Sequence, residues 1–474
     1  MSLILKRTLA TAAETLTKTP IEPKLVDVLI VGGGPAGLTL TAGLKNSKIA
    51  KELKISVIEG FNLSSVKTFH DETPSNFSNR VSSLTPQSIK YLQKIGAWNH
   101  IKEERVQPYD GIVVTEGISD ATLNFDSPEL ATMCENVNLQ SSLYQRIKEL
   151  QGQETNEEFG LEIKDNTKVI EITKDPFNQW PIVHLDNGET YKTRLLVGAD
   201  GFNSPVRKFS GIQSHGWFYK RFGVVSTLTL EYSPFRSIGW QRFLPTGPIA
   251  LLPMPGNQAT LVWSQTIELS ELLSKTEPEL FVQLVNGAFI LSDADMQYYY
   301  GQIRKGKTEG LIEDIKWRIS KVQKHLTEDQ IEDQYPVLAT SVEPRSIARF
   351  PLRLSHAETY VADRIALVGD AAHTTHPLAG QGLNMGQGDV QSLVKAIEKG
   401  MQRGLDIGNT LVLEPYWAER FPVNHLLLGV VDKLHKLYSF SNAPVVALRS
   451  FGVNALNSLS FVKDFMVSKV SGNK

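Results

Sequence analysis

The chain has 474 residues, of which 41% are hydrophobic and 21% are charged, and its formal net charge is −2. These values are typical of a globular protein and exclude a strongly basic nucleic-acid binder. The single cysteine, Cys134, excludes an internal disulfide and a cysteine-cluster metal site, so we expect no metal centre. No apolar run approaches the roughly 18 residues of a membrane-spanning helix.

The N-terminal segment, residues 1–23, differs in composition from the rest of the chain. Lys6, Arg7 and Lys18 lie among serine and threonine residues, and no acidic residue precedes Glu14. This composition is typical of a mitochondrial transit segment, although a frayed N-terminus is also common in globular proteins. We therefore exclude residues 1–23 from the expected fold.

A dinucleotide-binding βαβ pattern begins at residue 26. The apolar run 26–31 is followed by a glycine-rich turn, a helical stretch at 38–44 and a second strand at 55–58. Glu59 ends that strand, about 20 residues after the last glycine, where a carboxylate binds the adenosine ribose. The turn residues expected to contact the dinucleotide are Gly32, Gly34, Pro35, Ala36 and Gly37.

The next segments predict further elements of a mixed fold. A helical stretch is expected over residues 79–95, a strand over 168–172, and a strand ending in Asp200-Gly201. From residue 209 to residue 267, short apolar runs separated by turn residues indicate a sheet. These runs are 222–232, 239–244, 249–253 and 259–264.

Residues 304–334 are dense in charge, yet a helical spacing of apolar residues is kept by Leu311, Ile315, Ile319, Val322 and Leu326. This pattern predicts an amphipathic helix with a solvated face. The segment is interpreted either as a docking surface for a protein partner or as an insertion without a binding role.

A glycine-bearing loop at 369–386 lies between a predicted strand at 364–368 and a predicted helix at 387–399. A helix N-terminus with free N–H groups suits an anionic ligand. Gly380, Gly382 and Gly386 would let the backbone of this loop approach such a ligand closely.

The C-terminal stretch is unusually apolar for a tail. Residues 426–437 predict a helix, and residues 445–470 repeat its character. An apolar face opposite basic residues can lie on a membrane surface, but such a face more commonly packs on a core. Leu427, Val430, Val431, Leu434 and Leu437 form the apolar face, opposite Lys433 and Lys436.

These motifs together carry a resemblance to a known family. The glycine-rich turn, Leu195-Leu196-Val197-Gly198-Ala199-Asp200-Gly201 and the loop GDAAHTTHPLAGQGLN at 369–384 resemble the three FAD motifs of the single-component aromatic hydroxylases. The match extends from about Val26 to about Arg449. It implies FAD as the cofactor, with Arg80 and Asp200 near its pyrophosphate, Gln140 beside the flavin and Val169 near the adenine. In the loop at 369–384, the resemblance implies Asp370 at the ribityl and pyrophosphate side and the backbone of Gly382, Leu383 and Asn384 along the pyrimidine ring. It also implies cofactor contacts for the other motif residues of this loop, Gly369, Pro377 and Gly380.

The stretch 241–253 narrows the resemblance to the mitochondrial ubiquinone-pathway hydroxylases. The resemblance implies an α/β fold in which a Rossmann-like FAD-binding domain is interleaved with a β-sheet substrate domain and followed by C-terminal helices. The expected parts are 24–208 and 351–420 for the FAD-binding domain, 209–350 for the substrate domain, and 421–474 for amphipathic helices. No second glycine fingerprint follows a strand, so no separate NAD(P)H domain is expected.

The resemblance also implies a reaction. Reduced FAD and O2 would form a C4a-hydroperoxide that hydroxylates a polyprenyl-4-hydroxybenzoate-type precursor at C5. Electrons would come from ferredoxin and ferredoxin reductase, within a multi-enzyme complex held peripherally on the matrix side of the inner membrane. No side chain is assigned as catalytic, because the family motif explains His373 structurally and the sequence establishes no acid–base role for His376. Alternatives are another FAD-dependent hydroxylase or dehydrogenase, and a flavin-bound structural subunit.

Overall fold

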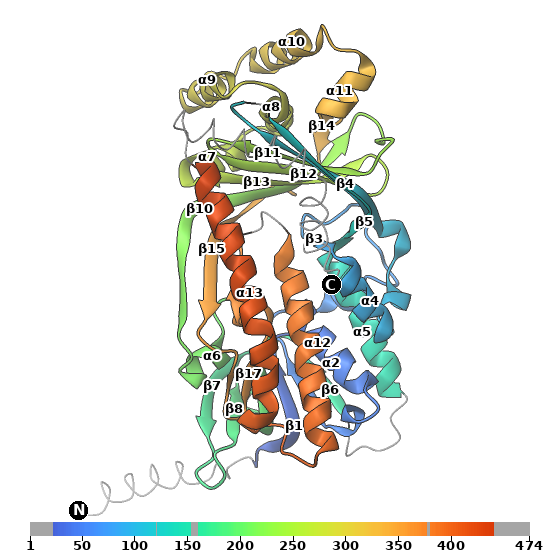
Figure 1. The fold of residues 1–474 in the computed structure, drawn as a ribbon, viewed down its shortest axis with the longest axis vertical. Coiled ribbons are helices and arrows are strands. Elements are labelled where there is room, and N and C mark those ends of the chain that lie inside the picture. Colours follow the sequence, from blue (N-terminus) through green and yellow to red (C-terminus); the bar gives the residue numbers. More distant parts are fainter. Residues whose placement is uncertain (1–21, 120, 153–159, 377–379, 440–474) are drawn as a thin grey trace, which may run out of the picture.

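The computed structural model describes residues 22–119, 121–152, 160–376 and 380–439. The expected transit segment, apart from its last two residues, and the expected helical character of 445–470 lie outside these ranges. The described chain is a mixed α/β structure, which confirms the predicted fold class. Figure 1 shows a lower part built on one sheet, an upper part built on another, and helices above the second sheet.

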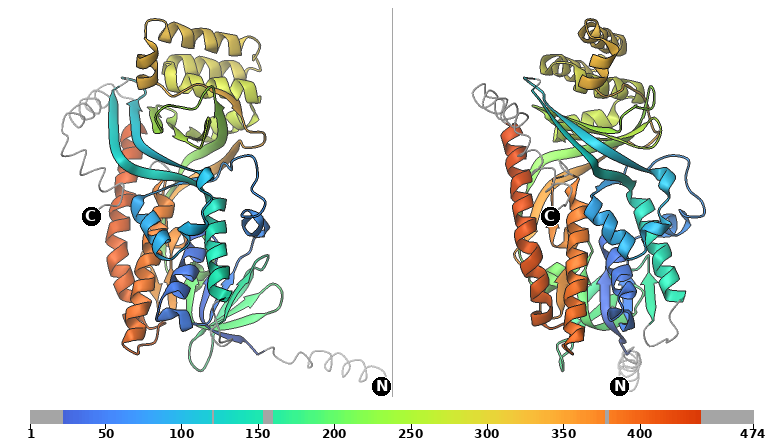
Figure 2. Two further views of the ribbon diagram at one scale, coloured as in Figure 1. Left: turned by 90° about the vertical axis from the view of Figure 1, so that its right-hand side faces the viewer. Right: turned by 45° about the vertical axis from the view of Figure 1, so that its right-hand side comes forward.

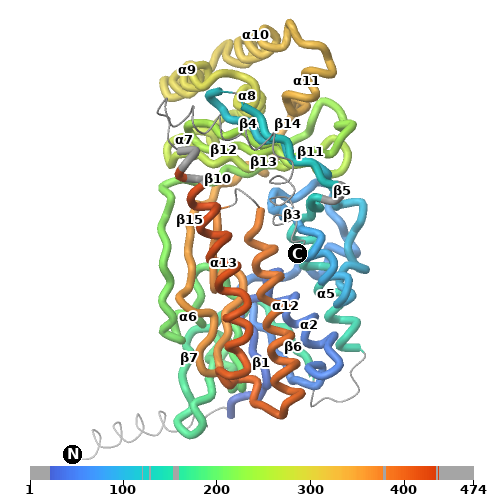
Figure 3. Tube along the Cα trace, viewed as in Figure 1, coloured from blue at the N-terminus to red at the C-terminus, as the bar shows by residue number. Residues whose placement is uncertain are grey.

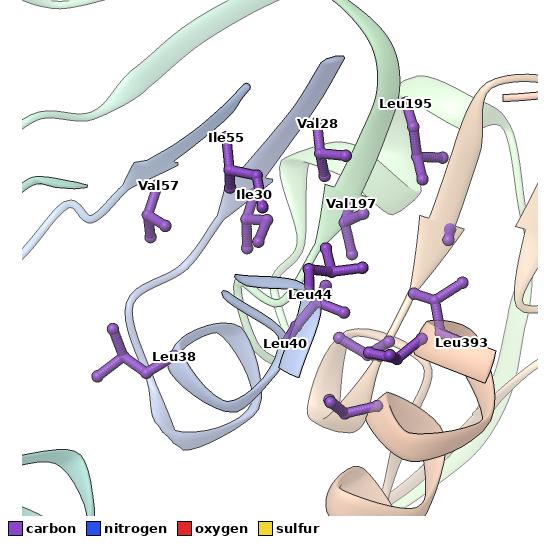
Figure 4. Packing of buried hydrophobic residues seen from close by; sticks show 14 of the residues in the cluster. Val28, Ile30, Leu38, Leu40, Leu44, Ile55, Val57, Leu195, Val197 and Leu393 are labelled. Carbon is purple, nitrogen blue, oxygen red and sulfur yellow. The ribbon is translucent and has the colours of Figure 1, made fainter. Parts of the chain in front are cut away.

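The first sheet has a parallel core in which β1 lies between β2 and β9. β1 is the apolar run predicted from the sequence, and Val28, Leu29 and Ile30 on it are completely buried. Figure 4 shows side chains of this sheet and of the following helix in one buried cluster. The strands of the first sheet are β1 (Lys24–Val31), β2 (Ile55–Ile58), β6 (Leu161–Lys164), β7 (Val169–Lys174), β8 (Pro181–Leu185), β9 (Thr190–Gly198), β16 (Val361–Ala362) and β17 (Ile365–Leu367).

The second sheet is largely antiparallel, and its strands come from separate stretches of the chain. It includes three strands from residues 81–135, β3, β4 and β5, which lie within the first expected FAD-binding part, so the two sheets are interleaved more finely than the expected boundaries. Figure 3 shows β10 and β15 running between the two levels of the molecule. The strands are β3 (Val81–Leu84), β4 (Val106–Glu116), β5 (Thr122–Glu135), β10 (Ser214–Leu230), β11 (Ile238–Leu244), β12 (Gly247–Pro253), β13 (Gln258–Thr266), β14 (Ala339–Val342), β15 (Ala348–Ala357) and β18 (His373–Thr374).

Helices of the lower part pack beside the first sheet, and Figure 2 shows two long ones running side by side toward the second sheet. These are α12 and α13, which contain the helices predicted at 387–399 and 426–437. The helices of this layer are α2 (Pro35–Asn46), α3 (Ser64–Thr68), α4 (Pro86–Lys94), α5 (Asn136–Gly152), α6 (Pro205–Ser210), α12 (Gln381–Gln402) and α13 (Thr410–Ser439).

Five helices form a cap on the second sheet, on the face that is turned away from the first sheet (Figure 1). The amphipathic helix predicted within 304–334 is confirmed as α10, and Leu311, Ile315 and Ile319 are buried as the helical spacing predicted. Val322 is exposed, and Leu326 lies beyond the end of α10. Gly306 and Gly310, with positive φ angles of 69° and 73°, separate α10 from α9. The cap consists of α7 (Ile267–Lys275), α8 (Pro278–Ile290), α9 (Asp293–Arg304), α10 (Leu311–Gln323) and α11 (Glu328–Gln334).

The continuous helix predicted over 79–95 is also wrong in its first half. Residues Val81–Leu84 form β3, which pairs with β5. The helix α4 begins only after Thr85, whose hydroxyl accepts a hydrogen bond from the Ser88 N–H, and Pro86 occupies its first position. Sheet pairing therefore decides the conformation of a segment whose local pattern resembles a helix.

A buried ion pair fixes the approach to β3. The Arg105 guanidinium donates to both carboxylate oxygens of Glu135, at 2.6 and 2.8 Å. The same guanidinium donates to the carbonyls of Pro74 and Asn76, and the Ser78 N–H donates to Glu135. The pair therefore attaches residues 74–78 to the end of β5, immediately before α5 begins.

We predict that Arg105→Met destabilises the protein by about 3–5 kcal/mol, because it leaves the Glu135 carboxylate buried without its partner. Urea unfolding measures the effect. The double variant Arg105→Met with Glu135→Leu should recover much of the loss, since no buried charge remains. Lys24→Ala, which breaks an exposed pair with Glu189, serves as the control and should cost less than about 1 kcal/mol. An Arg105→Met protein as stable as the control would contradict the prediction.

Candidate functional site

A cavity of about 740 Å³ lies between the two sheets. Its lower wall contains residues from all three predicted FAD motifs, and its upper wall is the second sheet. A depression of about 980 Å³ lies in the cap, but none of the expected binding residues lines it. The expected binding residues that line the cavity are Gly34, Pro35, Ala36, Gly369, Asp370, Gly380, Gly382 and Leu383.

In the first glycine turn, Gly32 and Gly37 are required by close contacts within the protein, whereas Gly34 borders open space. Gly32 has φ +111°, and a Cβ atom there would lie 2.2 Å from the Ala199 carbonyl oxygen. A Cβ on Gly37 would lie 1.9 Å from the Gly32 oxygen, so helix and strand approach too closely for any side chain. A Cβ on Gly34 would meet no atom within 4 Å, and Gly34 lines the cavity. The open space at Gly34 is therefore available to a ligand.

Glu59 and Gln140 flank the same turn. The Gly33 N–H donates to Glu59 Oε2 at 2.5 Å, and Gln140 Nε2 donates to the Gly33 carbonyl at 3.3 Å. Val169 begins β7, one residue after Lys168, whose side chain lies beside Gly60. Glu59, Gln140 and Val169 therefore lie at or near one end of the parallel core of the first sheet.

Arg80 is exposed and does not line the cavity, although the next residues, Val81 to Ser83, do. Its carbonyl accepts a hydrogen bond from the Asn136 N–H at the start of α5. The backbone therefore holds Arg80 next to the cavity, and its side chain is accessible to an anionic group.

Asp200 follows β9 and lies next to the first glycine turn, near the loop at 369–384. Its Oδ2 accepts a hydrogen bond from the Val206 N–H, while its buried Oδ1 has no hydrogen-bond partner among the described residues. Burial raises the pKa of Asp200 to about 6, against smaller opposing effects of Ser204 and Val206. The neighbouring Arg207 donates to the carbonyl of Ala371 and thereby joins the Asp200 motif to the loop at 369–384.

The FAD motif at 369–384 turns sharply at Gly369, where φ is +60°. Asp370 is accessible from the cavity but surrounded by protein, so burial raises the pKa of its carboxyl, and His373 partly opposes this increase. The motif rests on Asp389 of α12, a fully buried carboxylate. Asp389 accepts hydrogen bonds from the Gly369 N–H at 3.2 Å and from His373 Nε2 at 2.5 Å.

Asp389 also connects the motif to α13. Arg420 Nε and Asn424 Nδ2 donate to its Oδ1 at 3.0 and 2.9 Å. Burial alone would raise the pKa of Asp389, but His373, Arg420 and Asn424 outweigh it and lower the pKa below its ordinary value. His373 therefore has a structural partner, in agreement with its expected structural role. Nothing in the local pattern of Asp389 or Asn424 marked these residues beforehand.

The N-terminus of α12 carries the remaining expected residues, and Gly380 caps it in the left-handed conformation. Asn384 Nδ2 donates to the Ser83 carbonyl at 2.7 Å, and its Oδ1 accepts from the Thr85 N–H at 3.0 Å. The Asn384 side chain thus fixes this loop to β3, which leaves only its backbone to face a ligand. Pro377 lies outside the described residues.

The upper wall of the cavity is mainly apolar. Strands β11 and β12 form the hairpin expected at 241–253, and alternate residues of it face the cavity. A polar pair lies at the β3 end of this wall, where the hydroxyls of Tyr109 and Ser83 are 2.7 Å apart. Other wall residues are Ile112, Val114, Leu123, Phe125, Phe243, Pro248, Ala250, Leu252 and Val262. An aromatic ring with an apolar substituent suits such a wall.

The residues present fit an FAD molecule. The open position at Gly34 admits a pyrophosphate, the unpaired Oδ1 of Asp200 can accept a hydroxyl hydrogen bond, and the N-terminus of α12 supplies positive potential. Among the described residues, no group of three or more metal-ligating side chains is present. The site is therefore organised for a dinucleotide cofactor and an apolar substrate.

Two substitutions at the first turn separate folding from cofactor binding. We predict that Gly34→Ala folds with almost unchanged stability, because its φ of −71° suits alanine, but binds FAD at least about tenfold more weakly. Gly32→Ala should fold poorly, since its methyl group meets backbone. Circular dichroism reports folding, and flavin fluorescence titration reports affinity. Unchanged FAD affinity in Gly34→Ala would contradict the assignment of this turn.

Asp200 gives a pH-dependent prediction. Because its pKa is higher in the folded protein than its ordinary value, its contribution to stability falls as the pH rises from about 4 to 6. We expect the FAD-free Asp200→Asn protein to be more stable than wild type at pH 7.5, by roughly 1–3 kcal/mol, with the advantage shrinking toward pH 4. Urea unfolding at both pH values measures this. The control, Asp126→Asn on an exposed strand, should change little at either pH.

Known FAD-binding proteins are similar to this chain over most of its length. Residues 25–428 match the family described as FAD binding domain. The chain is 52% identical to the mitochondrial ubiquinone biosynthesis monooxygenase COQ6 of Saccharomyces cerevisiae, over 99% of this chain and 98% of that protein. It is 35% identical to the protein of the same name from Homo sapiens, over 94% of this chain and 92% of that protein.

Solved structures share the fold at lower identity. The p-nitrophenol 4-monooxygenase PnpA of Pseudomonas putida superposes with a TM-score of 0.65 at 17% identity, covering 95% of this chain and all of that chain. PqsL of Pseudomonas aeruginosa, described as a probable FAD-dependent monooxygenase, gives a TM-score of 0.64 at 20% identity, covering 91% of this chain and all of that chain. The chain therefore belongs to the FAD-binding-domain family, in the group of the mitochondrial ubiquinone biosynthesis monooxygenases, and is an FAD-dependent monooxygenase.

Proposed function

We propose that this protein hydroxylates the aromatic ring of a polyprenyl-4-hydroxybenzoate-type precursor of ubiquinone, at C5. The observation that carries the proposal is the single cavity that joins the three FAD motifs to an apolar sheet face. FAD, when bound, supplies the reducing electrons and the activation of O2. The full-length similarity to ubiquinone biosynthesis monooxygenases supports the choice of substrate class.

The protein contributes binding, orientation and exclusion of water. Gly32, Gly34 and Gly37 admit the cofactor backbone closely, and Asp389 fixes the adjacent loop at Gly369 in the same wall of the cavity. The N-terminus of α12 places partial positive charge where an anionic ring would lie. The apolar wall keeps water away from the reacting atoms, which limits unproductive loss of activated oxygen.

The cavity also offers polar positions for the substrate. The Tyr109 and Ser83 hydroxyls form a pair next to the loop that carries Gly380. Burial raises the pKa of Tyr109, so this hydroxyl remains protonated at neutral pH and can donate to a phenolic oxygen. His376 lines the cavity with its ring edge-to-face with Tyr219, at 5.3 Å. No side chain is assigned as a catalytic acid or base.

Ferredoxin and ferredoxin reductase are proposed as the electron donors. The charged segment 304–334 was a candidate docking surface, but it lies in the cap, and none of it lines the cavity. A donor bound on α10 or α11 would be separated from the cavity by a helix layer and a sheet, each about 10 Å thick. The cap position therefore favours the interpretation of this segment as an insertion without a role in electron transfer.

The proposed location is the mitochondrion, on the matrix side of the inner membrane, within a ubiquinone-forming enzyme complex. The curated relatives are named as mitochondrial. In the part of the chain that the structure describes, no helix is long and apolar enough to cross a membrane. A peripheral attachment is proposed because a polyprenylated substrate partitions into the bilayer.

The test supplies the FAD-loaded protein with the polyprenylated phenol under ¹⁸O2. The expected result is a product with one ¹⁸O atom at C5, detected by mass spectrometry, when ferredoxin, its reductase and NADPH are present. NADPH alone should support less than about a tenth of this rate. Absence of labelled product with either donor would contradict the proposed reaction. Equal rates with both donors would contradict only the proposed electron source.

A further inference from the structure

Helix α13 is apolar on two sides. Of the apolar face expected from the sequence, Val431 is buried and Leu427 is partly buried, so this side packs on the protein. Val430, expected on the same face, is exposed instead, and the side chains of Leu434 and Leu437 lie outside the described ones. A second apolar stripe remains at the surface, where Val423, Leu426 and Val430 are 53%, 69% and 46% exposed. These three residues recur at intervals of three and four, so they share one face of the helix. Packing within the described chain therefore leaves this stripe uncovered.

An exposed aromatic residue of β10 lies beside this end of α13. Trp217 is 45% exposed, and the Lys436 ammonium lies 4.5 Å from its ring centroid. Lys433 is exposed on the same part of α13. The nearby acid Asp432 is buried and is neutralised by Lys436 at 2.8 Å. The "α13–β10 face", defined as Trp217, Val423, Leu426, Val430, Lys433 and Lys436, is thus apolar, and its charged residues are lysines.

This face adjoins the cavity. Val430 is exposed, whereas the next residue, Val431, lines the cavity. Tyr219 of β10 donates a hydrogen bond to Asp432 and contacts the ring of His376, which also lines the cavity. One turn of α13 and one strand residue therefore separate the α13–β10 face from the space in which the substrate would be bound. Figure 1 shows the upper end of α13 reaching the level of the second sheet.

We propose that the α13–β10 face is the surface that docks on an anionic phospholipid bilayer and that the substrate enters the cavity beside α13. This inference rests on the proposed function, because only a polyprenylated substrate needs to be taken from a bilayer. Aliphatic side chains of a helix and a tryptophan beside lysines are the residues that bind the interfacial region of a membrane. The lysines complement negatively charged headgroups. A second copy of the chain would instead bring the same lysines together.

The test measures co-sedimentation of the FAD-loaded, full-length protein with vesicles of phosphatidylcholine and cardiolipin. The double variant Leu426→Glu with Val430→Glu should reduce the bound fraction at least about tenfold, since it places two charges on the docking side. Leu411→Glu is the matched control, because Leu411 is 70% exposed on the same helix but near its opposite end. This control should bind vesicles as wild type does. Both variants replace exposed residues, so circular dichroism and FAD content should not change.

A second measurement separates docking from catalysis. The double variant should hydroxylate a water-soluble analogue without a polyprenyl tail at the wild-type rate, but should lose at least about tenfold in rate on a polyprenylated substrate held in vesicles. Failure of wild type to hydroxylate either substrate would contradict the proposed function and leave vesicle binding as an independent result. Docking at this face is overturned by equal vesicle binding of wild type and double variant, by equal loss in the Leu411→Glu control, or by no binding of wild type. It is also overturned by a wild-type dimer that the double variant converts to monomers.

Discussion

The structure depends on one buried carboxylate, Asp389. It receives hydrogen bonds from the backbone of Gly369, from His373, and from Arg420 and Asn424 on α13. A charge inside a protein is tolerated only when several donors compensate for its lost hydration. Since those donors come from the FAD motif and from the last described helix, satisfying this charge also sets their relative positions. The cofactor side of the cavity and its α13 wall are therefore held by the same interaction.

The two sheets provide unlike environments to one cavity. Parallel strands of the first sheet end in turns whose glycines admit a polar, anionic cofactor. The second sheet presents alternate, mostly apolar side chains on one face and buries the other under the cap. Because β3, β4 and β5 pair in the second sheet while β1 and β9 lie in the first, the chain passes repeatedly between the two. This interleaving places the residues expected to bind the cofactor and the apolar wall proposed for the substrate around one cavity.

Helix α13 contacts the buried Asp389 network, the cavity and the solvent. No other described helix combines the three features that follow. Its middle contributes Arg420 and Asn424 to the buried network, its residue Val431 forms part of the cavity wall, and its outer stripe is apolar and exposed. A helix with two apolar sides would aggregate or bind a partner if one side stayed in water. The position of that outer stripe beside the cavity links the way the protein is held at a surface to the way its substrate arrives.

The sequence by itself determined the elements whose signal is local. The glycine turns, the strands before them and the carboxylate at Glu59 follow from spacing, because close backbone approach requires particular residues at particular positions. The same holds for the hairpin at 241–253 and the buried face of α10. Tertiary structure alone decided that residues 81–84 form a strand. It also decided that the buried carboxylates of Glu135 and Asp389 pair with Arg105 and Arg420. These features depend on partners far away in the chain, and a local pattern carries no information about which distant donor will meet a buried charge.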